Sequence, residues 1–313
     1  MKRTKTNKIR GLHPEMIIPD FPGPDLILSS DWHIRESLPI CRLDDFIGET
    51  QWEKIKFVSD LQKDFKCPVM LAGDLFHHWK PSPWLLTKAI EYLPNDLWTI
   101  FGQHDLQNHS MELIEKSGVY TLHTSGNLTL LPGGHWGTEP EEVSDEMGLA
   151  TLNRKITVMH RHIYKGKEPW PGCTSPKAIS ILRKYPEYDL IVTGDNHIPF
   201  IQEYQGRLLV NCGSLSRQDA DQMDYEPQVW LWYAKNNTVI PVKIPIKKDV
   251  ITREHIEKDT ERDNRIEAFM SVLSSESTTS LDFNRNLQTF LEKNNIRKVV
   301  KDIINKAMDY EEA

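Results

Sequence analysis

Short runs of apolar residues, each ending in polar residues, divide the first two thirds of the chain. They cover residues 25–30, 68–72, 97–101, 155–159, 189–193 and 207–210. Runs of this length, rich in β-branched residues and bounded by Gly or Pro, predict buried strands. Apolar residues at helical spacings predict helices over 44–64, 83–93 and 176–184. Strands that alternate with helices predict an α/β sheet with helical cover.

The last third of the chain follows two other patterns. Residues 229–233 and 238–244 predict two further strands, and the absence of a helical pattern between them predicts an antiparallel pair. Beyond residue 250, apolar residues at helical spacing predict an amphipathic helix; they are Ile296, Val299, Val300, Ile303, Ile304 and Ala307. We therefore expect an irregular arm over 1–24, a main α/β domain over 25–249 and a helical appendage over 250–313.

The composition is that of a soluble globular protein, with 39% hydrophobic and 27% charged residues. The net charge of −7 excludes a basic footprint over the whole chain, although a local basic rim can still bind phosphate. The four cysteines stand singly, which favours a reducing compartment over a disulfide framework or a zinc ribbon. With no secretory signal and no apolar run long enough to span a bilayer, we expect a cytoplasmic protein that does not bind membranes.

The residues that follow the predicted strands include many that can bind metal ions. They are Asp31 and His33, then Asp74, then Gln103, His104 and Asp105, then His160 and His162, and finally Asp195 and His197. Strand ends are where α/β sheets bind their ligands. A hydrolase with two divalent ions needs carboxylates and imidazoles that converge from several such ends, with one carboxylate and a water bridging the ions. One such group would be weak evidence, whereas groups after five strands predict a dinuclear centre.

At this point the sequence resembles a known family. The order of these groups is similar to that of the calcineurin-like metallophosphoesterases, whose motifs run DxH, GDxxx, GNHD, H and GHxH, and the resemblance covers residues 25–215. Within that superfamily, residues 73–77 (GDLFH), 80–82 (KPS) and 211–217 (NCGSLSR) resemble the SbcD-type DNA repair exonucleases. The resemblance implies a four-layer α/β sandwich of mixed sheets.

The resemblance also assigns roles by position. Asp31, His33 and His197 would hold the first metal, Asp74 would bridge, and the second metal would take Gln103, His160 and Asp195. His104, paired with Asp105, would protonate the leaving group or stabilise the transition state, and His77 would place the scissile phosphate. Manganese suits these nitrogen and oxygen ligands, with magnesium as the alternative. Candidates for substrate contact are Arg161, His162 and Arg217; Arg35, Lys80 and Lys165 are further candidates for a phosphate track, against the alternative of ordinary surface charge.

Two positions depart from the family pattern. The family's GNHD reads GQHD at 102–105, and its GHxH reads GDNH at 194–197. Glutamine keeps a carbonyl ligand on a longer side chain, and aspartate is a competent ligand for manganese or magnesium. Both changes fall on the second metal. We expect them to tune that site, because neither replaces a ligand by an apolar residue.

The leading hypothesis is an SbcD-like exonuclease or endonuclease that hydrolyses phosphodiester bonds in DNA with a metal-activated hydroxide. The resemblance implies an SbcC-like ATPase with a long coiled coil as partner, is compatible with a homodimer, and would suit a bacterium or bacteriophage. The alternatives are a phosphodiesterase or phosphomonoesterase of small molecules, and a scaffold of the same fold that does not catalyse.

Overall fold

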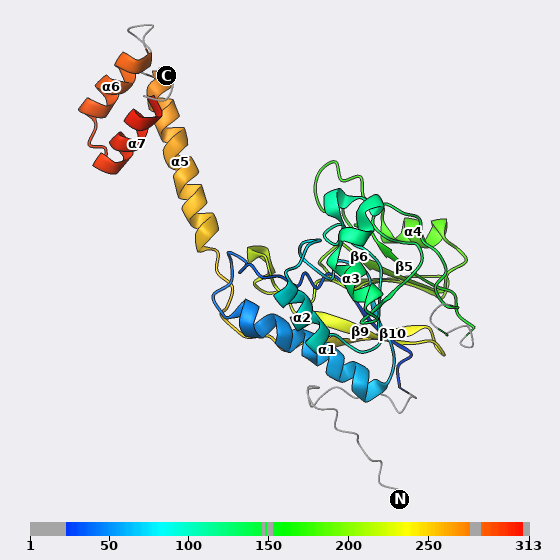
Figure 1. Ribbon diagram of the computed structural model, residues 1–313. Helices are drawn as coiled ribbons and strands as arrows, with labels where there is room; N and C mark the ends of the chain where they lie inside the picture. Colours follow the sequence, from blue (N-terminus) through cyan, green and yellow to red (C-terminus); the bar gives the residue numbers. More distant parts are fainter. Residues whose placement is uncertain (1–22, 146–147, 149–152, 276–282, 309–313) are drawn as a thin grey trace, which may run out of the picture. The chain divides into compact units, whose positions relative to one another are not determined.

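A computed structural model describes residues 23–145, 148, 153–275 and 283–308 of the chain (Figure 1). The arm expected over 1–24 therefore lies almost entirely outside the described residues. The chain forms two compact units, one ending at Thr252 and the other beginning at Arg253.

The first sheet carries six strands in the order β10-β9-β1-β2-β3-β4. Strands β1 to β4 are parallel, β9 is antiparallel to β1, and β10 is antiparallel to β9. The antiparallel pair predicted from residues 229–233 and 238–244 is confirmed. The strands are β1 Leu26–Ser29, β2 Val69–Leu71, β3 Leu97–Thr99, β4 Thr129–Leu130, β9 Gln228–Tyr233 and β10 Thr238–Lys243.

The second sheet has four strands in the order β5-β6-β8-β7, of which only β7 runs antiparallel to its neighbour. They are β5 Ile156–His160, β6 Leu190–Gly194, β7 Phe200–Tyr204 and β8 Arg207–Asn211. Strand β7 was not predicted, because its side chains are only partly buried and its apolar pattern is weak. Gln205 and Gly206, with φ of 52° and 74°, form the two-residue turn that joins it to β8 as a hairpin.

Four helices accompany the sheets of this unit. The helix expected over 44–64 begins as a π-helical turn, Phe46–Thr50, capped by the Asp45 carboxylate, and continues as α1. Helix α2 has Pro83 in its first turn, and Ser82 Oγ accepts the amide of Leu85 at 3.2 Å. The helices are α1 Gln51–Phe65, α2 Pro83–Tyr92, α3 Gly118–Thr124 and α4 Ala178–Lys184, and short 3-10 turns cover Gln107–His109, Met111–Lys116 and Ala220–Gln222.

Alternation of side chains along the strands creates three apolar layers. In β1, Ile27 packs with residues of α1, α2 and α3, whereas Leu28 faces the second sheet. In β5, Val158 faces the first sheet and Met159 packs with α4. Figure 1 shows α1 and α2 with β9 and β10, and α4 with β5 and β6. The order helices, sheet, sheet, helix confirms the predicted sandwich of two mixed sheets.

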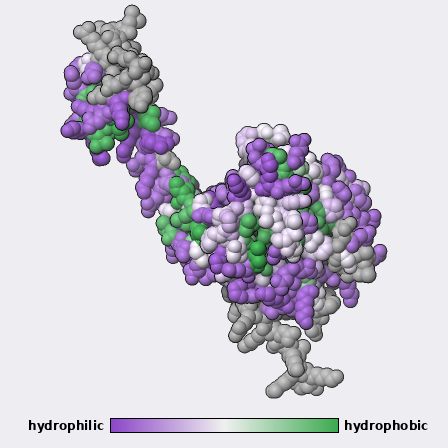
Figure 2. Space-filling model, in the orientation of Figure 1, coloured by the Kyte–Doolittle hydropathy of each residue, from purple (hydrophilic) through white to green (hydrophobic). Residues whose placement is uncertain are grey.

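The second unit contains α5 Glu254–Ser275, α6 Phe283–Lys293 and α7 Lys298–Met308. The apolar repeat identified in the sequence lies largely on α7, where Val299 and Ile303 are 69% and 63% exposed. Figure 2 shows apolar surface on this unit among polar side chains. Among the described residues, no helix combines the length and apolar character needed to cross a bilayer.

Candidate metal centre

The predicted site residues converge because parallel strands bring their carboxyl ends to the same edge. Strands β1, β2 and β3 of the first sheet and β5 and β6 of the second each deliver one group. The groups are Asp31 and His33 after β1, Asp74 after β2, Gln103 and His104 after β3, His160 at the end of β5, and Asp195 and His197 after β6.

Several of these residues have a left-handed backbone. The φ angles are 51° at Asp31, 46° at His33, 54° at Asp74 and 74° at Asp195. Such angles are uncommon for residues other than glycine and cost about 1–3 kcal/mol each where the residue is strained. The fold sustains these angles at strand ends, where they turn the chain sharply and bring the side chains toward one another.

Asp31, His33 and His197 form the first candidate ligand group. His33 Nε2 lies 3.2 Å from His197 Nε2, and each of these nitrogens lies 3.8 Å from Asp31 Oδ1. Asp31 is completely buried, and burial raises its pKa. Two imidazole nitrogens and one carboxylate at these separations are a suitable donor set for a divalent ion.

Asp74 connects this group to a second one, formed by Asp31, Asp74 and His160. Asp74 Oδ2 lies 3.6 Å from His33 Nε2 and 3.3 Å from His160 Nε2. Its other oxygen accepts the backbone amide of His104 at 2.9 Å, which fixes the carboxylate. His160 Nδ1 donates to the carbonyl of Ala72 at 2.6 Å, which points Nε2 toward Asp74. One carboxylate oxygen thus faces both groups, as a bridging ligand must.

Gln103 and Asp195, the two departures from the family pattern, contact each other directly. Gln103 Nε2 donates to Asp195 Oδ1 at 2.7 Å, and the backbone amide of Asp195 donates to both oxygens of Asp31 at 3.2 and 3.1 Å. Glutamine is one methylene longer than asparagine, and aspartate is shorter than histidine. The two changes therefore compensate in reach, and the carbonyl of Gln103 remains free to bind a metal.

This contact predicts that the two positions are energetically coupled. Gln103→Asn breaks the hydrogen bond, and Asp195→His crowds the longer amide, so each single change should weaken binding of the second manganese ion by about 10- to 100-fold. The double variant should recover most of the loss, with a coupling energy of about 0.5–3 kcal/mol. Calorimetric titration of the four proteins measures this cycle, and losses that simply add would contradict it.

Several buried atoms of the site have no hydrogen-bond partner. They are His33 Nδ1, Asp74 Oδ2, Gln103 Oε1 and His160 Nε2, of which the last three belong to residues expected to hold the second metal. Buried polar atoms are almost always paired, so unpaired atoms of these types gathered in one place fit a cation site. Imidazole nitrogens together with carboxylate and amide oxygens fit a pair of divalent ions such as manganese.

The proton on His160 predicts how metal binding depends on pH. Burial alone would lower the pKa of His160, but the Asp74 carboxylate beside it outweighs burial and raises the pKa to about 10. Below that pH, a metal ion must displace this proton, so its apparent affinity should rise about tenfold per pH unit between pH 6 and 8. Calorimetry in buffers of different ionisation enthalpy should detect about one proton released per chain. An affinity that does not change with pH would contradict this assignment.

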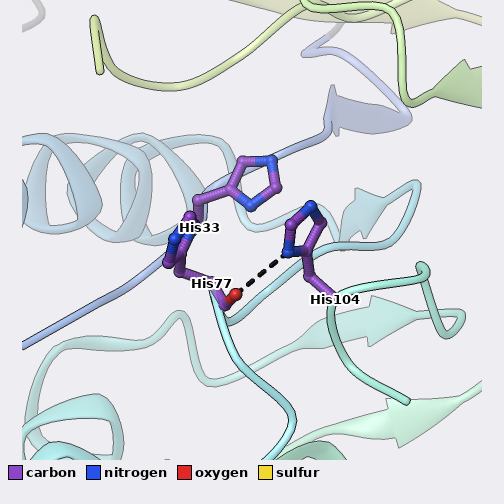
Figure 3. Close-up of side chains that lie close together, drawn as sticks. All are labelled: His33, His77 and His104. Atoms are coloured by element: carbon purple, nitrogen blue, oxygen red, sulfur yellow. Dashed lines mark hydrogen bonds between the residues drawn. The ribbon is translucent and has the colours of Figure 1, made fainter. Parts of the chain in front are cut away.

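Three histidines stand together at the mouth of the centre: His33, His77 and His104 (Figure 3). The ring of His77 stacks on that of His104, with centroids 5.3 Å apart and an interplanar angle of 18°. The ring of His33 lies edge-on to His104 at 4.8 Å. His104 Nδ1 donates to the carbonyl of His77 at 3.0 Å, so Nε2 is the nitrogen left to act on a substrate. Burial, with the Arg35 charge second, lowers the pKa of His77 to about 4.

The structure corrects the pairing expected between His104 and Asp105. The carboxylate of Asp105 is fully buried and accepts the backbone amides of Leu75, Phe76 and Gly102 at 3.3, 3.0 and 3.1 Å. It therefore joins the loops after β2 and β3, and the carbonyl of His77 orients His104 in its place. Sequence adjacency suggested the wrong partner because the loop turns the two side chains apart.

The three residues expected to contact substrate have different surroundings in the structure. Arg217 is 5% exposed and donates to the carbonyls of Met223 and Lys247 at 2.8 and 2.6 Å, which is a structural role. His162 Nδ1 shares a hydrogen bond of 3.0 Å with Ser175 Oγ, and its ring lies 5.2 Å from that of Trp170. Arg161 is exposed on the surface. None of the three belongs to the candidate ligand groups found among the described residues.

Two residues missed by the sequence analysis position the ligands. A Cβ added to Gly102 would lie 2.0 Å from Asp74 Oδ1, so only glycine lets the bridging carboxylate approach. The amide of buried Asn211 donates to the carbonyls of Asn196 and Ile198 at 2.6 and 2.8 Å and thereby fixes the loop that carries His197. The glycine that begins GQHD was a signal for the first, whereas the second depends on β8 lying beside β6.

The chain is similar to several known proteins. Among solved structures, the chain is similar to an archaeal phosphodiesterase (12% identity, TM-score 0.40, 70% of this chain and 99% of the other). It is also similar to zinc-bound Vps29 of Entamoeba histolytica (13% identity, TM-score 0.34, 70% of this chain and 97% of the other). A third similar structure is TT1561 of Thermus thermophilus (12% identity, TM-score 0.40, 71% of this chain and 100% of the other). No curated protein matches the sequence. Residues 25–226 match the family model of the calcineurin-like phosphoesterase superfamily domain, and the chain belongs to that superfamily.

Proposed function

We propose that this protein is a phosphodiesterase that hydrolyses phosphodiester bonds in DNA with two divalent metal ions, manganese foremost. The superfamily uses divalent metals, and the described residues supply candidate ligands for them. The observation that carries the proposal is the position of His77 and His104 directly beside these ligands. His77 belongs to the GDLFH and KPS segment that resembles the SbcD type, so this signature forms part of the reacting site itself.

The roles of the side chains follow from their contacts. Asp31, His33 and His197 would hold one ion, Gln103, His160 and Asp195 the other, and Asp74 would face both. When bound, such ions neutralise phosphate charge and lower the pKa of a coordinated water. His104 presents Nε2 toward the substrate because Nδ1 is engaged by the carbonyl of His77. From this position it donates a proton or a hydrogen bond to the departing oxygen.

Hydrolysis of end-labelled single- and double-stranded DNA with manganese, and with a chelator as the blank, tests the proposal. Bis-p-nitrophenyl phosphate serves as a small diester in parallel. Cleavage of DNA supports the nuclease, and its product ladder gives the polarity. Cleavage of the small diester alone favours a small-molecule phosphodiesterase, and silence on both substrates without bound metal favours a scaffold.

We also propose an ATPase with a long coiled coil as the partner. The exposed apolar side chains of α7, Val299, Val300 and Ile303, form a surface of the kind on which an amphipathic helix docks. DNA cleavage that appears only after the ATPase is added would support this partner. Cleavage at an unchanged rate with the ATPase present would count against it.

A further inference from the structure

A cavity of about 190 Å³ opens next to the metal centre. Arg35, His77, His78 and Lys80 are among its lining residues, and Arg35 and Lys80 give it a basic rim. His77 is shared between the cavity and the centre, because its ring also stacks on His104. A substrate held at His104 would therefore extend past His77 into this cavity.

The floor of the cavity is apolar. Ile34, Pro81 and Leu85 line it, and Ile34 and Leu85 also belong to the core beneath the first sheet. A volume of about 190 Å³ gives room for one flat ring with part of its sugar. An apolar floor of this size beneath a basic rim suits a single unpaired nucleoside with an adjoining phosphate.

The charges of the rim are arranged for an anion. The guanidinium of Arg35 donates to Gln218 Oε1 at 3.3 Å and to Ser37 Oγ at 3.2 and 2.8 Å, which orders it. Burial lowers the pKa of Arg35, and the negative charge of Asp219 opposes this effect. Glu36 also lines the cavity and keeps its negative charge, and its carboxylate is turned to Ser82, from which it accepts the amide and the hydroxyl at 3.0 and 2.8 Å. Lys80 is exposed and lines the same cavity. An ordered arginine together with an exposed lysine is a suitable pair for a phosphate group.

We propose that this cavity receives the nucleoside on the leaving-group side of the scissile bond, with the next phosphate bound by Arg35 and Lys80. We assign the cavity to the leaving-group side because His104 is the proposed proton donor to the departing oxygen. His77 stacks on His104 and also lines the cavity. The substrate class is then an unpaired DNA strand rather than a closed duplex. This inference rests on the proposed function and deepens it, because it states what the site recognises beyond the bond that breaks.

Lys80→Gln tests the role of the cavity. The substrates are thymidine dinucleotides carrying a terminal phosphate at either end, with bis-p-nitrophenyl phosphate as the reference diester. For each protein, kcat/KM on each phosphorylated dinucleotide is divided by kcat/KM on the reference diester. For one of the two dinucleotides, we expect this ratio to fall below the wild-type value by about tenfold in Lys80→Gln and by about 100-fold in Lys80→Glu. The loss should appear in KM, and the plot of log KM against log salt should become shallower by about 0.7 for one lost phosphate contact on a single strand.

Lys63→Gln is the matched control. Lys63 is equally exposed but lies in the last turn of α1, and the chain runs from there into the start of β2, at the sheet edge opposite the centre. The Lys63→Gln variant should leave all rates and the slope of log KM against log salt unchanged. Unchanged ratios and slopes in both Lys80 variants would overturn the cavity proposal while leaving the nuclease proposal standing. A wild-type protein that cleaves the reference diester but no nucleotide substrate would overturn both.

Discussion

Replacing His104 with alanine should lower kcat for phosphodiester hydrolysis by about 100- to 10,000-fold, the range expected when a general acid is removed. The ring of His104 is held by the carbonyl of His77 on one side and by stacking on the ring of His77. His77 turns its ring face, and not a nitrogen, toward His104, so the proton donor assigned to the departing oxygen is His104 Nε2. Steady-state rates on DNA and on bis-p-nitrophenyl phosphate measure the loss.

The metal content distinguishes a lost acid from a lost site. His104→Ala should still bind two ions per chain, because the candidate first and bridging groups use Asp31, His33, Asp74, His160 and His197. His255→Ala, in α5 of the other unit, removes a histidine outside the centre and should change neither rate nor metal content. A His104→Ala protein with full activity would remove His104 from the mechanism. Full loss accompanied by loss of metal would assign it a role as a ligand.

Replacing Asp74 with asparagine should abolish the dinuclear centre. Asp74 Oδ2 faces His33 and His160 at 3.6 and 3.3 Å, while Oδ1 accepts the amide of His104. In Asp74→Asn, the carbonyl oxygen keeps the bond to that amide, so the NH2 group must face the ions, and it cannot bind them. We expect at most one ion per chain and a fall in activity of roughly 1,000-fold or more, since both ions depend on this ligand.

A closely matched control exists for this substitution. Asp249 has the same left-handed backbone, with φ of 55° against 54° at Asp74, but it is exposed. Asp249→Asn therefore makes the same chemical change at the same backbone angle, away from the centre. Elemental analysis of both purified variants gives the metal content. Two ions in Asp74→Asn would show that another residue bridges them.

The paired contact between Gln103 and Asp195 bears on the second metal. Each change taken alone would displace a ligand, but the hydrogen bond of 2.7 Å between the side chains shows that they form one unit. The unpaired carbonyl oxygen of Gln103 remains buried beside the other candidate ligands. We therefore propose that the pair still serves a second metal, with more oxygen character than an asparagine and histidine pair would give, a donor set that suits manganese or magnesium better than softer ions.

Much of the catalytic unit could be predicted from local patterns. The buried strands β1, β2, β5, β6 and β8 were visible because each is a short apolar run followed by a chemically distinct group. Strand β7 escaped prediction because its side chains are only partly buried, and its position depends on the turn at Gln205 and Gly206. Strands could be predicted from the sequence where burial produces a strong apolar pattern. They could not be predicted where a strand is defined only by its hydrogen bonds to a neighbouring strand.

The sequence by itself determined an α/β fold with helical cover and the set of candidate ligands, since residue type and position after a buried strand are local properties, whereas the arrangement in two mixed sheets came from the family resemblance. Only the tertiary structure decided which atoms meet. The carbonyl of His77, and not the carboxylate of Asp105, accepts the hydrogen bond from His104. Arg217 donates to backbone carbonyls, and Gln103 donates to Asp195. Each of these depends on hydrogen bonds between segments far apart in the chain, whose direction is set by backbone turns and sheet order that no local pattern encodes.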